Sequence, residues 1–438
     1  MKARHFFMPG SLSHVGSPGS LPQFTLIMPR ERRAKLAGIS SLSGSGASPA
    51  TSFNAKKDSA DVASVREKYR GWTVESKIES KELNGDINSV SLGVNGLAIS
   101  SDGQRIASAN SDKTVKIWDA ASGRLTQSLR GHITQVWTVA MSPDGRHIVS
   151  NSPGDPIKVW DANTGVLLHD MPIPAVVYSG AFSADSRSFV SVGADENIRI
   201  WDVDKGRLIR ALTEQTVQLH GLAVSRDGKK IVSGAGDGTI TVWNAAAGAK
   251  LYTCKDSKLT VSAAFFPDDK TFVTGSYDSV LKVWDLNSRK LLRTIKIDQP
   301  ALQIKIAKND TIVLRNTSGK IEILDSTTGN LLRTLDDHSS GILALDVSSD
   351  GRRIFSGNRL GAIGIWDAGS GVLLASLITL DLRTTAIIRS DGTFSTDVAG
   401  ISHLKLVRGT ESLDMPDDYV AAFLRDRPFS DEPVIEAR

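Results

Sequence analysis

Eight histidines and one cysteine are the side chains of this 438-residue chain best suited to bind a metal or to act as a base or nucleophile. None of the histidines falls in a His-Glu-x-x-His pattern, and the lone Cys254 cannot form a Cys-x-x-Cys pair. No Gly-x-Ser-x-Gly elbow stands at a strand-to-helix turn. The sequence therefore predicts no catalytic residue, no metal and no cofactor, and we expect a protein that is not an enzyme.

A Trp-Asp pair, or a degenerate copy of one, recurs every 40 to 42 residues along most of the chain. The pairs are Trp118-Asp119, Trp160-Asp161, Trp201-Asp202, Trp243-Asn244, Trp284-Asp285, Leu324-Asp325 and Trp366-Asp367. A fixed period of this size is the mark of a repeat architecture.

An Asp-Gly pair lies 16 residues upstream of the Trp in four repeats, beginning at Asp102, Asp144, Asp227 and Asp350. Asp and Gly tolerate the positive φ of tight hairpin turns, so each pair between two apolar runs predicts a hairpin. Two further short strands follow each hairpin. Four short strands in a period of about 40 residues predict one blade of a β-propeller.

With these marks in phase, the chain resembles the WD-repeat β-propeller family over roughly residues 75–408. The resemblance implies an all-β propeller of seven or eight four-stranded blades. It also implies a structural hydrogen-bond set in each blade, made of the Trp, a Ser or Thr, a turn Asp and an entrance His. The turn Asp is matched at Asp112, Asp195, Asp237 and Asp278, with Asp155 one residue off this spacing, and the entrance His is matched at His132 and His338. Most blades would therefore lack the full set.

The number of blades is open between seven and eight. Asp391-Gly392 begins a degenerate eighth repeat that ends at Val407-Arg408. A strand within Val74 to Leu83 could complete the last blade and close the ring between the two ends of the chain. The alternative is a seven-bladed ring with the eighth segment packed outside it. Either way, we expect residues 71–410 to form the propeller.

The segment after the last Trp is similar to the tail that follows WD repeats in some bacterial proteins. The likeness rests on Ser390-Asp391-Gly392, on Arg408-Gly409 and on the stretch Met415 to Leu424, in that order, and it indicates a bacterial origin. Within the tail 411–438, residues Asp414 to Arg427 predict a short helix with Tyr419 and Phe423 on one face. The helix could dock on the propeller or bind a partner.

The charge is unevenly distributed. The chain carries a net charge of +4, but residues 1–57 contribute +7, which leaves −3 for the remainder. A mildly acidic propeller disfavours nucleic-acid binding. Residues 1–70 are rich in Ser, Gly and Pro and predict a disordered or targeting leader. No apolar run is long enough to span a membrane, and a single cysteine fits a cytoplasmic protein.

A binding surface is better supported than a catalytic site. In the family that the chain resembles, the inner strands open on the top face beside the central channel. The position seven residues before each hairpin Asp gives Asn95, Trp137, Tyr178, His220, Val261, Gln303, Leu343 and Thr384. Three consecutive repeats thus carry rings at Trp137, Tyr178 and His220, and Tyr277 could join them. These rings could bind a partner or merely pack along the channel wall.

The leading interpretation is a non-catalytic protein–protein interaction scaffold, with a monomeric propeller that binds other proteins in a hetero-complex through its top face. A second interpretation is a sensor or regulatory subunit of a separately encoded enzyme, such as a caspase-like peptidase or a kinase. A third is a propeller enzyme with an active site in the channel mouth, because a fold alone does not exclude activity.

Overall fold

The computed structural model describes residues 64–65, 67–70, 73–76, 93–379, 385–390, 394–395, 404–408 and 411–414, with gaps at 174–175, 214–217, 257 and 337–340. Most of the expected leader, residues 1–70, lies outside these ranges, as do His338 and Thr384. The predicted C-terminal helix also falls outside them, except that Asp414 is the last residue of a strand.

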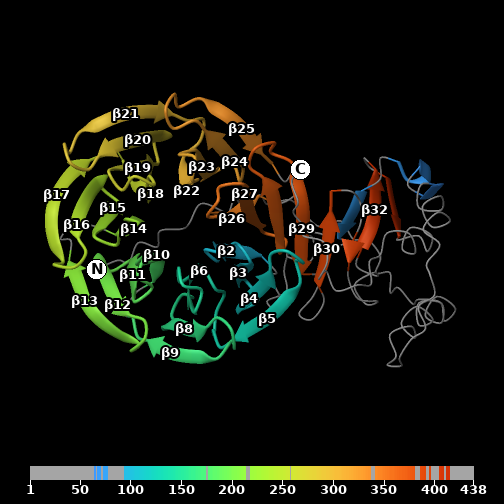
Figure 1. The fold of residues 1–438 in the computed structure, drawn as a ribbon, viewed down its shortest axis with the longest axis horizontal. Helices are drawn as coiled ribbons and strands as arrows, with labels where there is room; N and C mark the ends of the chain where they lie inside the picture. Colours follow the sequence, from blue (N-terminus) through green and yellow to red (C-terminus); the bar gives the residue numbers. More distant parts are fainter. Residues whose placement is uncertain are drawn as a thin grey trace, which may run out of the picture. The chain divides into compact units, whose positions relative to one another are not determined.

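Seven four-stranded antiparallel blades form a ring, and each blade is built from one repeat in sequence order (Figure 1). The innermost strands are β2 (Val94–Ile99), β6 (Thr138–Met141), β10 (Val177–Phe182), β14 (Leu219–Val224), β18 (Thr260–Phe265), β22 (Ala301–Ile306) and β26 (Ile342–Val347). The second strands are β3 (Arg105–Asn110), β7 (His147–Asn151), β11 (Ser188–Gly193), β15 (Lys230–Ala235), β19 (Thr271–Ser276), β23 (Ile312–Asn316) and β27 (Arg353–Asn358).

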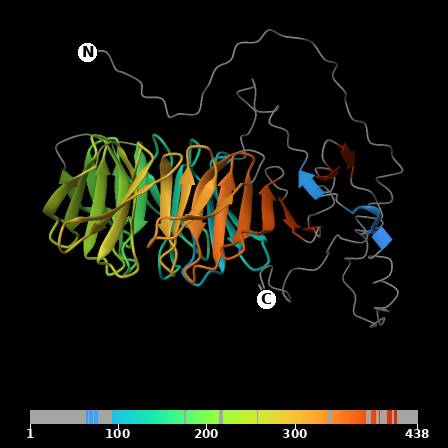
Figure 2. The same ribbon diagram turned by 90° about the horizontal axis from the view of Figure 1, so that it is seen from above.

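The third strands end in the Trp-Asp pairs or their degenerate copies. They are β4 (Thr114–Asp119), β8 (Ile157–Asp161), β12 (Asn197–Asp202), β16 (Thr239–Asn244), β20 (Val280–Asp285), β24 (Ile321–Leu324) and β28 (Ala362–Asp367). The outer strands are β5 (Leu125–Arg130), β9 (Leu167–Met171), β13 (Arg207–Thr213), β17 (Ala249–Lys255), β21 (Leu291–Lys296), β25 (Leu331–Leu335) and β29 (Leu373–Thr379). Seen edge-on, the strands run between the two faces of the ring (Figure 2).

The ring has seven blades, so closure through an eighth blade is wrong. Strands β26 and β27 of the last blade pack directly against β2 of the first, which leaves no gap for another sheet. The expected eighth repeat is divided instead. Its first strands, β30 (Thr385–Arg389) and β31 (Phe394–Ser395), extend the last blade to six strands.

The end of the expected eighth repeat pairs with the start of the described chain. Strand β32 (Leu404–Arg408) is antiparallel to β1 (Thr73–Ser76) and to β33 (Glu411–Asp414). These three strands form a sheet of their own and not a blade. The expected pairing between the two chain ends is thus present, but outside the ring. The rest of the stretch up to Leu83 lies outside the described residues.

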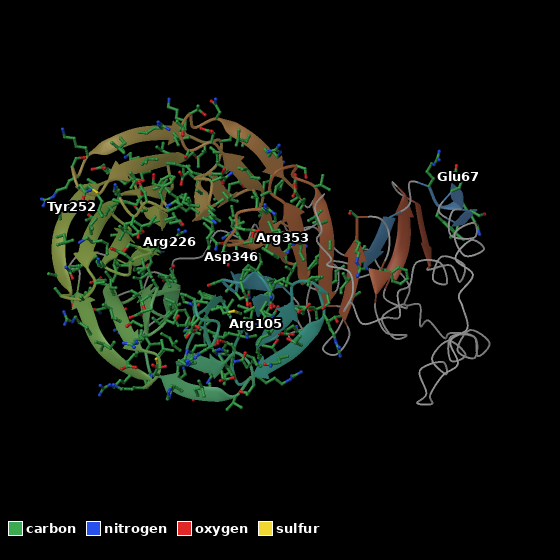
Figure 3. The ribbon with its side chains drawn as sticks, in the orientation of Figure 1. Glu67, Arg105, Arg226, Tyr252, Asp346 and Arg353 are labelled. Atoms are coloured by element: carbon green, nitrogen blue, oxygen red, sulfur yellow. The ribbon has the colours of Figure 1, made fainter. Side chains whose placement is uncertain are left out.

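Polar contacts as well as apolar packing join the first and last blades. The Asp346 carboxylate in β26 accepts a hydrogen bond from the Ile99 backbone N–H in β2 at 2.9 Å, and it pairs with Lys305 in β22 at 2.8 Å. One side chain therefore ties three consecutive blades together. It lies toward the inside of the ring in Figure 3.

Each blade's third-strand apolar residue packs on the blade before it. Trp160 belongs to a buried cluster with Ile117 and Leu129 of the first blade, and Trp118 to one with Phe355 and Leu377 of the last. Leu324 replaces the Trp in the sixth blade and packs on the fifth. Within the described residues, seven such clusters occur, one at each blade boundary.

Short-range hydrogen bonds fix the turns that the sequence predicts. In the first hairpin, the Gly103 N–H donates to the Ser100 carbonyl at 2.8 Å, and Gly103 has a φ of 70°, which favours glycine. The Ser100 hydroxyl donates to the Asp102 carboxylate at 2.5 Å. The Asp of the Trp-Asp pair has a separate role, because the Asp119 carboxylate accepts the Ser122 backbone N–H at 2.6 Å in the next turn. Asp161, Asp202, Asp285 and Asp367 accept backbone N–H groups in the same way.

In six blades the Trp indole N–H donates to a hydroxyl ten residues earlier on the second strand. The donors are Trp118, Trp160, Trp201, Trp243, Trp284 and Trp366, and the acceptors are Ser108, Ser150, Ser191, Ser233, Thr274 and Ser356. The distances are 2.8–3.0 Å. The sixth blade has Leu314 and Leu324 at these positions, so donor and acceptor are lost together and neither position leaves a buried polar group unpaired.

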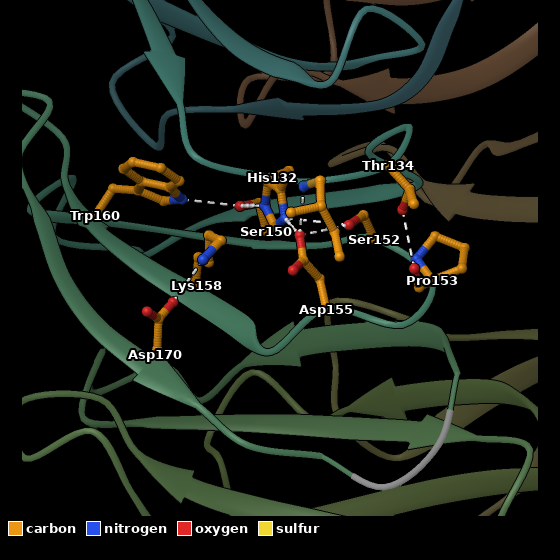
Figure 4. A network of polar contacts seen from close by, with 10 residues as sticks. His132, Thr134, Ser150, Ser152, Pro153, Asp155, Lys158, Trp160 and Asp170 are labelled. Carbon is orange, nitrogen blue, oxygen red and sulfur yellow. Dashed lines mark hydrogen bonds and ion pairs between the residues drawn. The ribbon is translucent and has the colours of Figure 1, made fainter.

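The second blade carries the full hydrogen-bond set (Figure 4). Ser150 bonds both Trp160 Nε1 at 2.8 Å and His132 Nε2 at 2.7 Å, and His132 Nδ1 lies 2.9 Å from the Asp155 carboxylate. Burial lowers the pKa of His132, so its imidazole is neutral at pH 7. A neutral ring then donates from Nδ1 to Asp155 and accepts the Ser150 hydroxyl proton at Nε2.

Buried ion pairs occupy the corresponding space in three other blades. Two residues before the Trp, Lys116 pairs with Asp112 at 2.5 Å, Arg199 pairs with Asp195, and Lys282 pairs with Asp256 at 2.5 Å. Asp256 lies 28 residues before Trp284, which is the spacing of His132 from Trp160. An aspartate thus stands at the entrance position of the fifth blade. The other turn aspartates are less buried: Asp237 pairs with Lys255 at 3.0 Å, and Asp278 accepts the Ser276 hydroxyl.

Ser150 bonds two side chains, whereas the equivalent Ser191 bonds one, so we expect their removal to destabilise the protein by different amounts. Ser150→Ala leaves both Trp160 Nε1 and His132 Nε2 without a partner, whereas Ser191→Ala affects only Trp201. Each buried polar group left unpaired costs about 1–3 kcal/mol. We expect Ser150→Ala to lower the free energy of unfolding about twice as much as Ser191→Ala in chemical denaturation. Equal losses would show that the histidine bond contributes nothing.

The buried pair in the fifth blade predicts a non-additive result. Lys282→Met leaves the Asp256 carboxylate buried without its cation and should cost about 3–5 kcal/mol of unfolding free energy. Adding Asp256→Asn removes that charge, so the double variant should be more stable than Lys282→Met alone. Denaturant unfolding of the two variants measures this difference, and a double variant less stable than the single one would contradict it.

The hydrogen bonds from the hairpin serines to their aspartates predict a contribution to folding stability that depends on pH. Hydrogen bonds from Ser100 and Ser183 lower the pKa values of Asp102 and Asp185 below their ordinary value of 3.8. A lowered carboxylate pKa gives stability that is present above the ordinary pKa and is lost as the pH falls through the folded-state pKa. The double variant Ser100→Ala/Ser183→Ala should therefore have a lower Tm than wild type at pH 6. The Tm difference should shrink between pH 4 and pH 2.5, and a constant difference would contradict the assignment.

Candidate functional site

The innermost strands share an irregularity at one end. The pairing of β2, β10, β14, β18, β22 and β26 with their second strands skips one residue near the strand start. A β-bulge of this kind re-aims the side chain of the skipped residue. The skipped residues are Asn95, Tyr178, His220, Val261, Leu302 and Leu343, and Trp137 has the equivalent place just before β6. We call these seven residues the channel mouth.

One member of this set differs from the sequence-based expectation. In the sixth blade the skipped residue is Leu302, and Gln303 pairs in register with Arg315. In this blade Asp310 occupies the Gly position of the turn, with a φ of 63°, and Asn309 occupies the Asp position, so counting back seven residues from Asp310 stops one residue short of Leu302. The Gln303 amide instead bonds both the Leu345 carbonyl at 2.9 Å and the Leu345 N–H at 3.1 Å in the next blade. Gln303 is thus a link between blades.

Tyr178 and His220 form a stacked pair across two neighbouring blades. Their ring centroids are 4.9 Å apart and the ring planes differ by 4°. Both side chains are half-buried. Burial raises the pKa of Tyr178 and lowers the pKa of His220, so both rings are uncharged at neutral pH. The pair therefore presents a flat, neutral, partly exposed aromatic surface.

Trp137 lies in the blade before this pair and is also half-buried. Its backbone N–H donates to the Asn151 carbonyl at 2.9 Å. Its carbonyl oxygen lies 2.9 Å from the point where a Cβ on Gly96 would stand, so the first blade needs a glycine there. Among the described residues Trp137 has no ring stack like that of Tyr178. Tyr277 lies at the same end of the blades, in the β19–β20 turn, with 37% of its surface exposed.

Among the described residues of the channel mouth, no side chain is arranged as an activated nucleophile. Burial lowers the pKa of His220, and no carboxylate counteracts this shift. Cys254 lies in β17, where burial raises its pKa to about 12 and leaves it protonated. No group of three or more His, Cys, Asp or Glu residues that could hold a metal occurs in the described part of the chain. Nor does that part contain a helix long and apolar enough to cross a bilayer.

Comparisons with known proteins agree with this architecture. A family model described as the IFT122 first beta-propeller matches residues 93–367, which run from the start of the first blade to the last Trp-Asp pair. The small ribosomal subunit protein RACK1 of Medicago sativa is 27% identical over 163 residues, or 37% of this chain and 43% of that protein.

Two further relatives match in the same way. The U3 small nucleolar RNA-associated protein 21 homolog of Schizosaccharomyces pombe is 27% identical over 199 residues, or 43% of this chain and 22% of that protein. WD repeat-containing protein 1 of Gallus gallus is 25% identical over 170 residues, or 36% of this chain and 28% of that protein. The chain thus spans less than half the length of each of these relatives.

All three relatives are eukaryotic, and they give no support to the bacterial origin that the C-terminal segment indicated. The family model covers more than half of the chain and coincides with the seven-bladed ring. The chain therefore belongs to the WD-repeat β-propeller family represented by that model.

Proposed function

We propose that this chain is a non-catalytic scaffold that captures a protein partner at the channel mouth. The observation that carries the proposal is the Tyr178–His220 stack, half-exposed one blade away from Trp137. Aromatic side chains held rigidly at a surface lose little entropy on binding and often dominate the binding energy of protein interfaces. The ring of blades fixes these side chains before a partner arrives.

The relatives support the scaffold interpretation through their names. One is a ribosomal subunit protein and another is associated with a small nucleolar RNA, so both names place the protein in an assembly. The regulatory-subunit interpretation is a special case of the same function, in which the captured partner is an enzyme. Identification of the partner distinguishes the two.

The proposal predicts that removal of two rings abolishes capture. Wild type and Trp137→Ala/Tyr178→Ala would be immobilised, and the proteins that each retains from a lysate would be quantified by mass spectrometry. A purified partner that depends on the rings should then bind the double variant at least tenfold more weakly, since tenfold is only about 1.4 kcal/mol. The Tm should fall only slightly, because both rings are half-exposed.

Tyr252→Phe provides the control for this experiment. The Tyr252 hydroxyl donates to the Leu286 carbonyl of the next blade at 3.1 Å, on the outer strand and away from the mouth. This variant should retain every partner that wild type retains. A double variant that keeps all partners, or a Tm loss large enough to explain the missing capture, would refute the role of the rings.

A further inference from the structure

One position of the second strand lies against the next blade's innermost strand. Nine residues before the third-strand Trp, or its Leu324 replacement, the chain has Ala109, Asn151, Val192, Gly234, Gly275, Arg315 and Gly357. A Cβ added to Gly234 would stand 2.4 Å from Thr260 in the next blade, and one added to Gly357 would stand 2.4 Å from Val94. The sixth blade has the long, charged Arg315 at this crowded place.

The Arg315 guanidinium has one weak bond and one buried donor without a partner. Its Nη1 donates to the Ile342 carbonyl of the last blade at 3.3 Å. Its Nε is buried and has no hydrogen-bond partner. A buried donor left unpaired is costly, and more so when it is charged. Burial, with a contribution from the charge of Arg359, lowers the pKa of Arg315 to about 10, so the side chain still carries its charge at pH 7.

Arg359 lies beside the same backbone segment, in the exposed turn between β27 and β28. Its Nε is 4.0 Å from the point where a Cβ on Gly341 would stand. The two guanidinium groups therefore flank Gly341 and Ile342. The next residue, Leu343, belongs to the channel mouth, so the two arginines stand at the mouth's edge on the sixth and seventh blades.

Neither arginine forms an ion pair with any carboxylate of the described residues. This distinguishes them from the buried cations Lys116, Arg199 and Lys282, each of which has an aspartate within 4 Å. Two neighbouring positive charges repel each other and favour an anion between them. Guanidinium groups also offer donors in a planar fork that fits the oxygens of a phosphate.

We propose that Arg315 and Arg359 form a phosphate-binding site, and that the phosphate is a monoester on a peptide bound across the channel mouth. The phosphate charge of about −1.5 to −2 at pH 7 matches two guanidinium groups better than a single carboxylate does. The peptide part of the proposal rests on the proposed function, because Trp137, Tyr178 and His220 on the second to fourth blades would hold an apolar side chain of the same peptide. The arginines would then select for phosphorylation.

The test uses the full chain with two probes, inorganic phosphate and a library of phosphoserine peptides measured before and after dephosphorylation. We expect wild type to bind inorganic phosphate weakly and to bind phosphorylated peptides at least tenfold more tightly than their dephosphorylated forms. Arg315→Gln and Arg359→Gln should each remove most of this preference. Arg315→Lys keeps the charge but loses the fork and should give an intermediate affinity, which guards against a folding defect in Arg315→Gln.

Arg226→Gln is the matched control, because it removes the same charge from the β14–β15 turn at the opposite end of the blades. It should leave the affinities within twofold of wild type. Trp137→Ala/Tyr178→Ala should weaken peptide binding and leave inorganic phosphate binding unchanged. If the ring variant has no effect but the arginine variants do, the aromatic site fails and the phosphate site stands.

Three results would overturn the phosphate site. The first is equal binding of phosphorylated and dephosphorylated peptides by wild type. The second is that wild type does not bind phosphate but the Asp337→Asn variant does. Asp337 lies four residues before Gly341 in the sequence, and this result would mean that its carboxylate is the counter-ion of the arginines. The third is binding to vesicles that carry phosphoinositides with no preference for phosphopeptides, which would assign the arginines to a lipid headgroup.

Discussion

The ring depends on the packing of each third-strand Trp, or of Leu324, against the blade before it. Each of the seven buried clusters draws residues from two blades, so no blade encloses a core alone. Stability of this kind is cooperative around a closed ring, because the last boundary uses the same packing as the other six. The cluster of Trp118 with Phe355 and Leu377 closes the ring without exchanging a strand between the ends of the chain.

Because apolar packing carries the architecture, the polar set beside each Trp varies between blades. The second blade uses His132, Ser150 and Asp155, whereas the first, third and fifth blades place a cation and an aspartate in the corresponding space. The sixth blade has no Trp at all, and there the buried Glu322 accepts a hydrogen bond from Asn316 at 2.7 Å. These solutions share one property: each of the polar side chains named here has a partner within the same blade or on the loop that enters it.

The channel mouth is built from an irregularity that costs the fold little. A single skipped residue in each innermost strand turns one side chain out of the regular alternation, and the closed ring holds all of these side chains in fixed relative positions. Rings occupy the second to fourth blades, while two guanidinium groups stand beside the sixth and seventh. In the function that we propose, a rigid surface with an apolar side and a basic side selects a partner by composition and by charge, without any conformational change in the propeller.

The sequence by itself determined the repeat, the four strands of each blade and the hairpin turns, because these depend on residues close together in the chain. Asp102 and Gly103 set a turn wherever they occur between two strands, and a Trp every 41 or so residues marks the same strand of each blade. The sequence also placed Trp137, Tyr178 and His220 at one equivalent position, since their repeats have hairpins of equal length.

Only the tertiary structure decided the number of blades, because the fate of a degenerate eighth repeat depends on whether seven blades already close the ring. It also decided that Leu302 and not Gln303 faces the mouth, that Asp256 replaces an entrance histidine and that Arg315 meets Arg359. Each of these features depends on contacts between blades. The physical reason is that residues in contact across a blade boundary are about 40 residues apart in the sequence, and a local sequence pattern carries no information on their distance or direction in space.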